Sequence, residues 1–381
     1  MASSQIFSFD GGIIFISAII LVYVIISLLQ KLKPGTLEKI GVRLEGGAIL
    51  YRTERLNSAI VSFARRHARA IKLLGDASTI GGIGLMAFAL FYFHSNLLSF
   101  LLKPETASPV SPIIPGVTLG LDALPYFLIA VFLTIVPHEL AHALTASAEG
   151  LPLKSTGLFL MLVFPGGFAE IDEEELGKSN LRTKLRVLSS GSFTNILSFA
   201  LLVVLAMFLV HPAGVKVAAT IHGYPAEGVL EANDVILEVN GIKTPTLEDF
   251  TRILETMKPG ETVLLKVQRG GKIIDVSLTL APRPGNTSRG FLGVQIQQQV
   301  NNELLYNILY WCMILTSSVA IINMLPALPL DGGRVFQALI EKVVSLQRAK
   351  QITIAFTIYT AFLVIFNIAF STSIYGLIPF P

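Results

Sequence analysis

Six long stretches that carry almost no charge constrain this chain more than any other feature. They run over 11–29, 77–102, 123–148, 187–210, 304–330 and 352–380. A helix needs about 20 apolar residues to cross a bilayer, and each stretch reaches or approaches that length. Only 14% of the 381 residues are charged, whereas a soluble globular protein carries about 25%. We therefore expect an integral membrane protein with about six transmembrane helices.

Basic residues in short loops predict the orientation of these helices. Ten Lys and Arg residues lie between Lys31 and Lys72, whereas the loop 103–122 holds one. The first of these loops should therefore be cytoplasmic, which places both chain ends outside and the end of the third stretch at the cytoplasmic side. The first stretch lacks a preceding basic residue and a clear cleavage site, which favours a retained anchor over a signal peptide. In a prokaryote the membrane would be the cell membrane.

The polarity of the chain divides it into four parts. Residues 1–122 hold two apolar stretches and the basic loop, 123–210 hold the third and fourth stretches, and 299–381 hold the last two. Between them, charge and strands of mixed polarity return at 212–298. There VILEVNG (235–241) predicts a strand, and 262–280 predicts a hairpin around Gly270 and Gly271. A short helix is expected within 244–261, with Thr246 as its N-cap.

Two histidines and a glutamate interrupt the third apolar stretch, in VPHELAHALTASAEG (136–150). His138 and His142 are four residues apart, so on a helix they lie on one face, one turn apart. Two imidazoles at that spacing can bind one zinc ion, and Glu139 beside them can accept a proton from water at the metal. The plain alternative is a pair of histidines that only pack between helices. Because polar groups are costly in hydrocarbon and usually functional there, the pattern favours metal binding.

A catalytic zinc ion needs a third protein ligand, which this motif does not supply. The chain has one cysteine, which excludes a four-cysteine site. Glu170 is one candidate, and Asp331 in NMLPALPLDGGRVFQ (323–337) is a better one, at the depth predicted for the histidines. Pro326 and Pro329 prevent a regular helix before it, which suits a ligand loop. An Asp331 that only caps the following helix is an alternative that the residues leave open.

Several motifs together resemble one family. HELAH (138–142), NMLPALPLDGG (323–333) and an inserted PDZ-like module resemble the site-2 proteases, which are intramembrane zinc metalloproteases. TGLFLMLVFPGGFAEID (156–172) is similar to that family's membrane-associated hairpin, and SSGSFTN (189–195) to a motif of its fourth membrane segment. The resemblance implies a multi-pass α-helical membrane protein with a membrane-associated β-hairpin and one α/β PDZ-like domain between the fourth and fifth helices.

The PDZ-like part of this resemblance rests on two runs of the insert. GYPAEGVLEANDVILEVNGIKT (223–244) resembles the core of a PDZ domain. RGFLGVQI (289–296) resembles the peptide-binding loop and strand, placed last as in circularly permuted PDZ domains. Asn233 departs from the family, which usually has glycine at that position. The implied ligands of this domain, which the predicted topology places outside, are peptide C-termini.

The resemblance also implies roles for individual residues. One Zn2+ ion per chain would be bound by three ligands, His138, His142 and Asp331, with Glu139 as the general base. Asn195 would hydrogen-bond the substrate or the developing oxyanion, unless it only makes an interhelical hydrogen bond of the kind common for Asn in membranes. Asn323 has the same two interpretations.

The implied substrate is a single-pass transmembrane protein in the lipid bilayer, cut within or near its membrane helix, as in regulated intramembrane proteolysis. The net charge of +3 gives no argument for a nucleic acid partner. The stretch 157–169 is uncharged and too short to span, so we expect it to enter the membrane as a hairpin that turns near Pro165, Gly166 and Gly167. Its edge could pair with the unwound substrate as an added strand; a purely structural hairpin is the alternative.

Two other classes of function remain to be compared with the protease. A membrane metal transporter would explain intramembrane His and Asp residues, and so would a metal-dependent binding scaffold. Neither needs Glu139 at its place between the two histidines, whereas a hydrolase needs a base there. The sequence therefore favours a zinc metalloendopeptidase.

Overall fold

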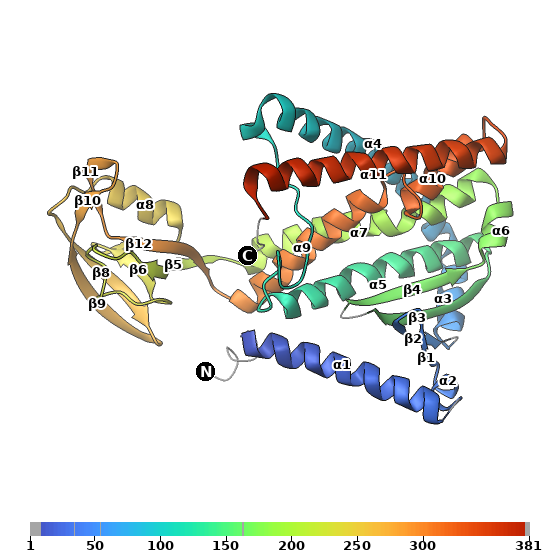
Figure 1. The fold of residues 1–381 in the computed structure, drawn as a ribbon, viewed down its shortest axis with the longest axis horizontal. Coiled ribbons are helices and arrows are strands. Elements are labelled where there is room, and N and C mark those ends of the chain that lie inside the picture. Colours follow the sequence, from blue (N-terminus) through green and yellow to red (C-terminus); the bar gives the residue numbers. More distant parts are fainter. Residues whose placement is uncertain (1–8, 34, 54, 162–163, 378–381) are drawn as a thin grey trace. The chain divides into compact units, whose positions relative to one another are not determined.

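The computed structural model describes residues 9–33, 35–53, 55–161 and 164–377 (Figure 1). The chain separates into two compact units. We call the first, Met1–Val203 with Ile308–Pro381, the membrane unit, and the second, Val204–Asn307, the inserted unit.

Five helices of the described chain are long and apolar enough to cross a membrane. They fall on the second to sixth predicted stretches: α4 (Ala68–Leu102), α5 (Leu124–Glu149), α7 (Leu181–Leu209), α9 (Glu303–Asn323) and α11 (Leu346–Tyr375). These helices make the chain an integral membrane protein. The first predicted stretch forms α1 (Phe9–Leu32), but its side chains are described only over Ser17–Leu32, which is too short a run to count as a membrane span. A count of six transmembrane helices therefore stays a prediction.

The fifth stretch is helical over less of its length than predicted. Helix α9 ends at Asn323, and α10 (Asp331–Ile340) begins after an irregular segment. Pro326 and Pro329 explain the break, because proline lacks the N–H that a helix interior needs and clashes with the preceding turn. The end of the sixth predicted stretch, 378–380, lies outside the described residues.

A four-stranded antiparallel sheet lies in the membrane unit, in the order β1-β2-β3-β4. Its strands are β1 (Val42–Glu45), β2 (Ala48–Thr53), β3 (Leu153–Met161) and β4 (Phe164–Ile171). The sequence analysis treated the first two as part of a loop, whereas they are strands; the cytoplasmic placement of this segment stays a prediction. Gly46 and Gly47 join them in a two-residue turn at φ of 58° and 82°, a backbone region that glycine enters at little cost.

The predicted hairpin within 156–172 is present as β3 and β4, but its turn is not where the sequence placed it. Leu160 pairs with Pro165 and Leu158 with Gly167, so the Pro-Gly-Gly run lies inside β4. The last described pair is Met161 with Phe164, and residues 162–163 between them lie outside the described chain. Strand β3 is therefore paired on both sides, by β2 and β4, and within the described residues β4 has a free edge.

Short helices connect these elements. They are α2 (Thr36–Lys39), α3 (Arg55–Arg66), the 3-10 turn Pro104–Thr106 and α6 (Glu173–Lys178). Helix α3 is fastened to the sheet through Asn57. Its Nδ2 donates to the Lys154 carbonyl at 3.1 Å, and its Oδ1 accepts from the Thr156 hydroxyl at 3.0 Å. The basic segment before α4 is thus part of the folded membrane unit.

A buried ion cluster joins α4, α5 and α7. The Arg186 guanidinium donates to both carboxylate oxygens of Asp76, at 2.8 and 2.7 Å, and to Glu149 at 2.5 Å. Only 9% of the Arg186 side chain and 7% of the Glu149 side chain are exposed. Arg182 also binds Asp76, but 70% of its side chain is exposed. Arg186 is therefore the member that links three helices in low-dielectric surroundings.

The inserted unit is an α/β fold with its own core. Its main sheet has the order β12-β5-β6-β8-β9, with β7 beside β6, and β10 pairs with β11. Its elements are β5 (Pro212–Thr220), β6 (Val235–Val239), β7 (Ile242–Lys243), α8 (Leu247–Glu255), β8 (Thr262–Arg269), β9 (Lys272–Thr279), β10 (Ala281–Arg283), β11 (Asn286–Phe291) and β12 (Val294–Val300). Buried Val, Leu and Ile side chains of the sheet pack around Phe250 of α8.

Three local predictions in the insert are confirmed. VILEVNG contains β6, and β8 and β9 form the hairpin around Gly270 and Gly271. Thr246 caps α8, because its hydroxyl accepts from the Asp249 N–H at 3.0 Å. Asn233, which stands where PDZ domains usually have glycine, has a φ of 73°. Asn is one of the few non-glycine residues that tolerate this left-handed region, so the departure keeps the same turn.

We expect Arg186→Ala to lower the thermal midpoint of the purified protein in detergent by several degrees. The change removes the cation that Glu149 and Asp76 share. Asp76 keeps Arg182 and Glu149 keeps Lys72 at 3.7 Å, but the buried Glu149 carboxylate loses its closest partner, and removing one member of a buried ion pair is destabilising. Arg182→Ala is the matched control and should change the midpoint little, because exposed ion pairs contribute little. Equal midpoints for the two variants would contradict a structural role for the Arg186 cluster.

Candidate metal centre

Helix α5 presents the first two candidate ligands to the interior of the membrane unit. His138 and His142 are 5% and 7% exposed, on the buried face of the helix. Their Nε2 atoms lie 3.2 Å apart. The spacing of four residues therefore produces the geometry that was predicted from helical periodicity.

The start of α10 brings Asp331 to the same place. Its Oδ2 lies 3.2 Å from His138 Nε2 and 3.1 Å from His142 Nε2. The next two residues must be glycine, because a Cβ on Gly332 would meet the Met324 carbonyl oxygen at 2.3 Å, and one on Gly333 would meet the Ala327 backbone at 2.5 Å. The N-cap of α10 is Leu330, without a side-chain hydrogen bond. Asp331 thus faces the histidines instead of capping the helix.

These three ligand atoms fit a metal ion. They are 3.1–3.2 Å from one another, and ligands at about 2.0–2.1 Å from a tetrahedral zinc ion are separated by roughly 3.3 Å. Among the described residues this is the one group of three His, Cys, Asp or Glu side chains that could hold a metal. Two imidazoles and a carboxylate are also a ligand set that zinc accepts.

The outer nitrogen of His142 is fixed by α7. His142 Nδ1 lies 2.7 Å from the Val187 carbonyl oxygen. A carbonyl can only accept, so Nδ1 carries the hydrogen and Nε2 keeps a lone pair for a metal. Such a bond to the outer nitrogen commonly orients a metal-binding histidine.

Asn195 of α7 contacts the outer nitrogen of His138, as the Val187 carbonyl contacts that of His142. Its Nδ2 lies 3.1 Å from His138 Nδ1, while its fully buried Oδ1 has no partner among the described residues. A half-turn of the amide exchanges these two atoms, which have nearly the same shape. The oxygen then accepts the Nδ1 hydrogen, and His138 Nε2 is left free for a metal. The partnerless oxygen thus fits the metal-bound form of the histidine.

Asn323, the last residue of α9, touches two of the candidate ligands. Its Nδ2 donates to Asp331 Oδ2 at 2.9 Å and lies 3.1 Å from His138 Nε2. Both asparagines that were singled out from the sequence therefore lie against the three-residue group. Each of them contacts at least one candidate ligand, so neither makes only an interhelical hydrogen bond away from the group.

Gly191 of α7 leaves space at the centre of this group. A Cβ at this position would lie 2.4 Å from His142 Nε2 and 2.6 Å from His138 Nε2. These are the atoms that face Asp331. The glycine of the SSGSFTN motif therefore leaves open the volume that an ion between the ligands would use.

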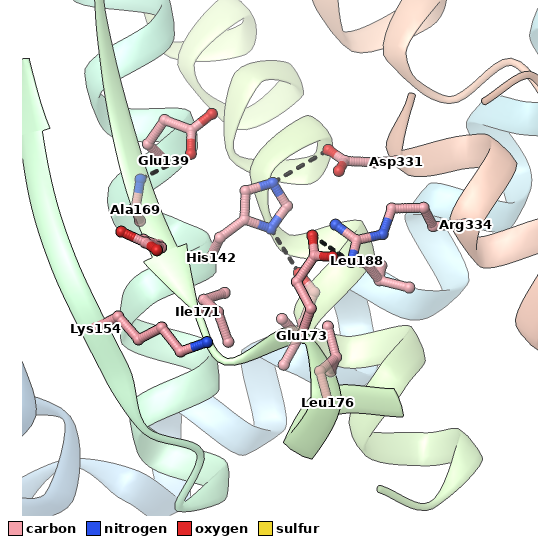
Figure 2. A pocket seen from close by; sticks show the side chains of 12 residues that line it. Glu139, His142, Lys154, Ala169, Ile171, Glu173, Leu176, Leu188, Asp331 and Arg334 are labelled. Carbon is pink, nitrogen blue, oxygen red and sulfur yellow. Dashed lines mark hydrogen bonds and ion pairs between the residues drawn. The ribbon is translucent and has the colours of Figure 1, made fainter. Parts of the chain in front are cut away.

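A polar cavity of about 550 Å³ opens beside the ligands (Figure 2). Glu139, His142 and Asp331 line it, together with Lys154, Glu170, Glu173 and Arg334. Glu139 points from α5 toward β4, where its Oε2 accepts the Ala169 N–H at 3.3 Å. The Arg334 guanidinium pairs with Glu173 at 3.2 Å. A cavity with this lining can hold water next to the candidate ligands.

Glu170, the other candidate ligand from the sequence, has a different partner. It accepts from the Ser155 hydroxyl at 2.7 Å and is not part of the ligand group. The acidic run after it, Asp172–Glu175, begins α6, and Asp172 caps this helix by accepting from the Glu174 and Glu175 N–H groups. The Glu175 N–H and then Lys154 hold the pKa of Asp172 below its usual range. The sequence contains a signal for this helix start, because an acidic residue three positions after a capping side chain, here Glu175 after Asp172, is typical of one.

The sequence of this chain is similar to those of several known proteins. The chain matches Peptidase family M50 over residues 126–366. An uncharacterized protein of Methanocaldococcus jannaschii is 32% identical over 247 residues, which are 64% of either chain. A membrane-bound transcription factor site-2 protease homolog of Arabidopsis thaliana is 28% identical over 49% of this chain and 38% of its own. The chain thus spans less than two thirds of the length of these two relatives.

Another relative in sequence and one solved structure are also similar to parts of this chain. A protein of Fusobacterium nucleatum, named provisionally as a zinc metalloprotease, is 23% identical over 57% of this chain and 88% of its own. The PDZ domain of an SdrC-like protein from Listeria innocua is 27% identical, with a TM-score of 0.21, over 23% of this chain and 96% of that domain.

The membrane helices and the buried ligand group define an integral membrane protein with a candidate metal centre. The chain belongs to Peptidase family M50, and the predicted membership of the site-2 protease family is confirmed.

We expect Gly191→Ala to abolish metal binding while the protein stays folded, because the added methyl group occupies the space between the imidazoles. The measurement is zinc per chain by elemental analysis, with the thermal midpoint as the check on folding. Gly84→Ala in α4 is the control, since a Cβ there meets nothing within 4 Å. A Gly191→Ala protein that carries as much zinc as the Gly84→Ala protein would show that the ion binds elsewhere.

Proposed function

We propose that this chain is an intramembrane zinc metalloendopeptidase, which hydrolyses a peptide bond within or near the transmembrane helix of a membrane protein. The observation that carries the proposal is the meeting of His138, His142 and Asp331 at 3.1–3.2 Å, with Glu139 on the same helix at the rim of a polar cavity. Membership of a peptidase family supports it, and so do the names of the Arabidopsis and Fusobacterium relatives.

One Zn2+ ion per chain would be held by His138, His142 and Asp331. When bound, zinc lowers the pKa of water toward neutrality and polarises a carbonyl group. Val187, Asn195 and Asn323 keep the ligands in place through the contacts described above. Ligand partners of this kind set the tautomer and ring orientation on which metal affinity depends.

Glu139 would serve as the general base and then as the acid. Its carboxylate takes a proton from the attacking water as the new C–O bond forms at the scissile carbonyl. The same proton then passes to the leaving nitrogen as the C–N bond breaks. The carboxylate lines the polar cavity, so water can reach it although α5 is apolar.

Strand β4 offers a surface on which an unwound substrate could pair. The Ala169 N–H donates to Glu139, so it points away from β3, and alternation along the strand gives Gly167 and Pro165 the same direction. Pro165 has no N–H to offer, which leaves Gly167 and Ala169 as the donors of this edge. An extended substrate paired there would pass beside Glu139.

Substrate recognition and membrane placement belong to the same proposal. From the basic loops we expect the ligand group to lie toward the cytoplasmic side of the lipid bilayer and the inserted unit outside. In the inserted unit, a cavity of about 190 Å³ lies between α8 and the β11–β12 segment, lined by Phe250, Leu254 and Ile296. A peptide C-terminus could add to the free edge of β12 there, as in PDZ domains. The substrate would be a single-pass transmembrane protein.

Replacing Glu139, the proposed general base, distinguishes the protease function from a metal transporter and from a binding scaffold. We expect Glu139→Gln to reduce cleavage of a reporter transmembrane helix by about 10²–10⁴-fold with zinc content unchanged. The matched control is Glu170→Gln, which changes another acid of the same cavity and should cleave within a few-fold of wild type. Cleavage that survives Glu139→Gln would remove Glu139 from the mechanism. A wild-type protein that carries zinc across vesicle membranes and cleaves nothing would support the transporter.

The strand-pairing step has its own test. We expect Gly167→Pro to abolish cleavage with zinc content and thermal midpoint retained, because it removes the edge N–H that does not bond Glu139, without breaking a bond to β3. Gly167→Ala adds a Cβ at the same position but keeps the N–H, and it should cleave like wild type. Comparable cleavage by the two variants would mean that the β3–β4 hairpin is only structural.

A further inference from the structure

A second cavity, almost entirely apolar, lies on the other side of Glu139. Its volume is about 340 Å³, within the usual range for ligand pockets, and its walls come from α3, α5 and the sheet. Among the residues that line it, Glu139 is the single charged one. Tyr51, Leu140 and Leu158 contribute large apolar walls, each more than 40% exposed. Most of the lining is thus apolar, as in many ligand pockets, and its one charged group is the Glu139 carboxylate.

The apolar cavity and the polar one share a boundary. Glu139 and Ala169 line both cavities, and the 3.3 Å hydrogen bond between them stands at this boundary. A chain paired on β4 beside Ala169 would therefore have the ligand group on one side and the apolar cavity on the other. Side chains of a strand point alternately to its two faces, so one of them can enter the cavity while its neighbours do not.

Small residues make the cavity large enough for a bulky side chain. Ala59 of α3 and Ala143 of α5 face it from the helices, and Gly157 and Gly167 from the sheet. Both glycines lie at close contacts: a Cβ on Gly157 would meet the Phe168 ring at 2.6 Å, and one on Gly167 would lie 3.3 Å from the Val136 side chain, which is tight. The two alanines on the helices are therefore the better positions at which to fill the cavity.

We propose that this cavity is a substrate subsite, which accepts one large apolar side chain, such as Leu, Met or Phe, next to the scissile bond. The proposal rests on the proposed protease function and adds a preference to it. Tyr51, Ala59 and Ile60 precede the family match at 126–366. The wall formed by α3 and β2 thus lies outside the range matched by the family, and the expected preference follows from the residues of this chain.

The test uses the full-length zinc-loaded protein in detergent and a reporter transmembrane helix whose cut site is mapped by mass spectrometry. Each position near the cut is changed in turn to Gly, Leu and Phe. At one position wild type should cleave the Leu and Phe substrates about tenfold or more faster than the Gly substrate, the usual range for filling an apolar pocket. Equal rates for all three residues at every position would overturn the subsite.

Variants of α3 test the cavity itself, away from the ligands on α5. Ala59→Phe fills it and should lower the rates for the Leu and Phe substrates relative to that for the Gly substrate about tenfold. Ile60→Ala enlarges it and should raise the relative rate for a Trp substrate. Ser62→Phe is the control, because Ser62 is exposed on the same helix and does not line the cavity.

The outcomes separate this subsite from the protease function. Ala59→Phe that slows every substrate equally would overturn the subsite and indicate that a lipid chain or a structural contact uses the cavity. If Ala59→Phe proves unstable, an unchanged substrate preference in Ile60→Ala overturns it as well. A wild-type enzyme that cuts the reporter without regard to side chain refutes the subsite alone. A wild type that cuts no reporter refutes the protease function and the subsite with it.

Discussion

The contact of two imidazoles with one carboxylate inside an apolar helix bundle determines much of the surrounding structure. Buried polar groups are costly unless each has a partner, and here Val187 and two asparagines supply these partners. The contact also needs space. Gly191 leaves the centre open, and Gly332 lets α10 approach the segment after α9. The glycines and prolines that interrupt the apolar stretches thus serve one local arrangement.

Parts of this arrangement could be predicted from the residues alone, and others could not. The positions of His138 and His142 follow from helical periodicity, because both lie on one helix. Asp331 is 193 residues from His138, and no local rule relates the two. The proline-rich segment indicated an irregular backbone, yet capping of the next helix was an equally good interpretation of the residues. The family resemblance favoured Asp331 as a ligand, and the structure places its carboxylate against both imidazoles.

The sheet explains two differences between the predicted and the observed structure, one at Gly46 and Gly47 and one at Pro165 to Gly167. Gly46 and Gly47 are a hairpin signal between short strands, but the basic residues around them suggested a solvated loop. The run Pro165 to Gly167 has the composition of a turn. It lies in a strand instead, because its proline is on the edge that makes no hydrogen bonds to β3, where the missing N–H costs nothing. Which strand is at the edge depends on the complete sheet, so the segment alone could not show it.

The order of the elements along the chain has a consequence for biosynthesis. Helix α5 is made well before α10, so a growing polypeptide inserts both histidines into the membrane long before it acquires the carboxylate. Until Asp331 is synthesised, two imidazoles alone would bind an ion weakly. The incomplete chain would therefore lack the proposed hydrolytic activity and would not cleave neighbouring membrane proteins during assembly.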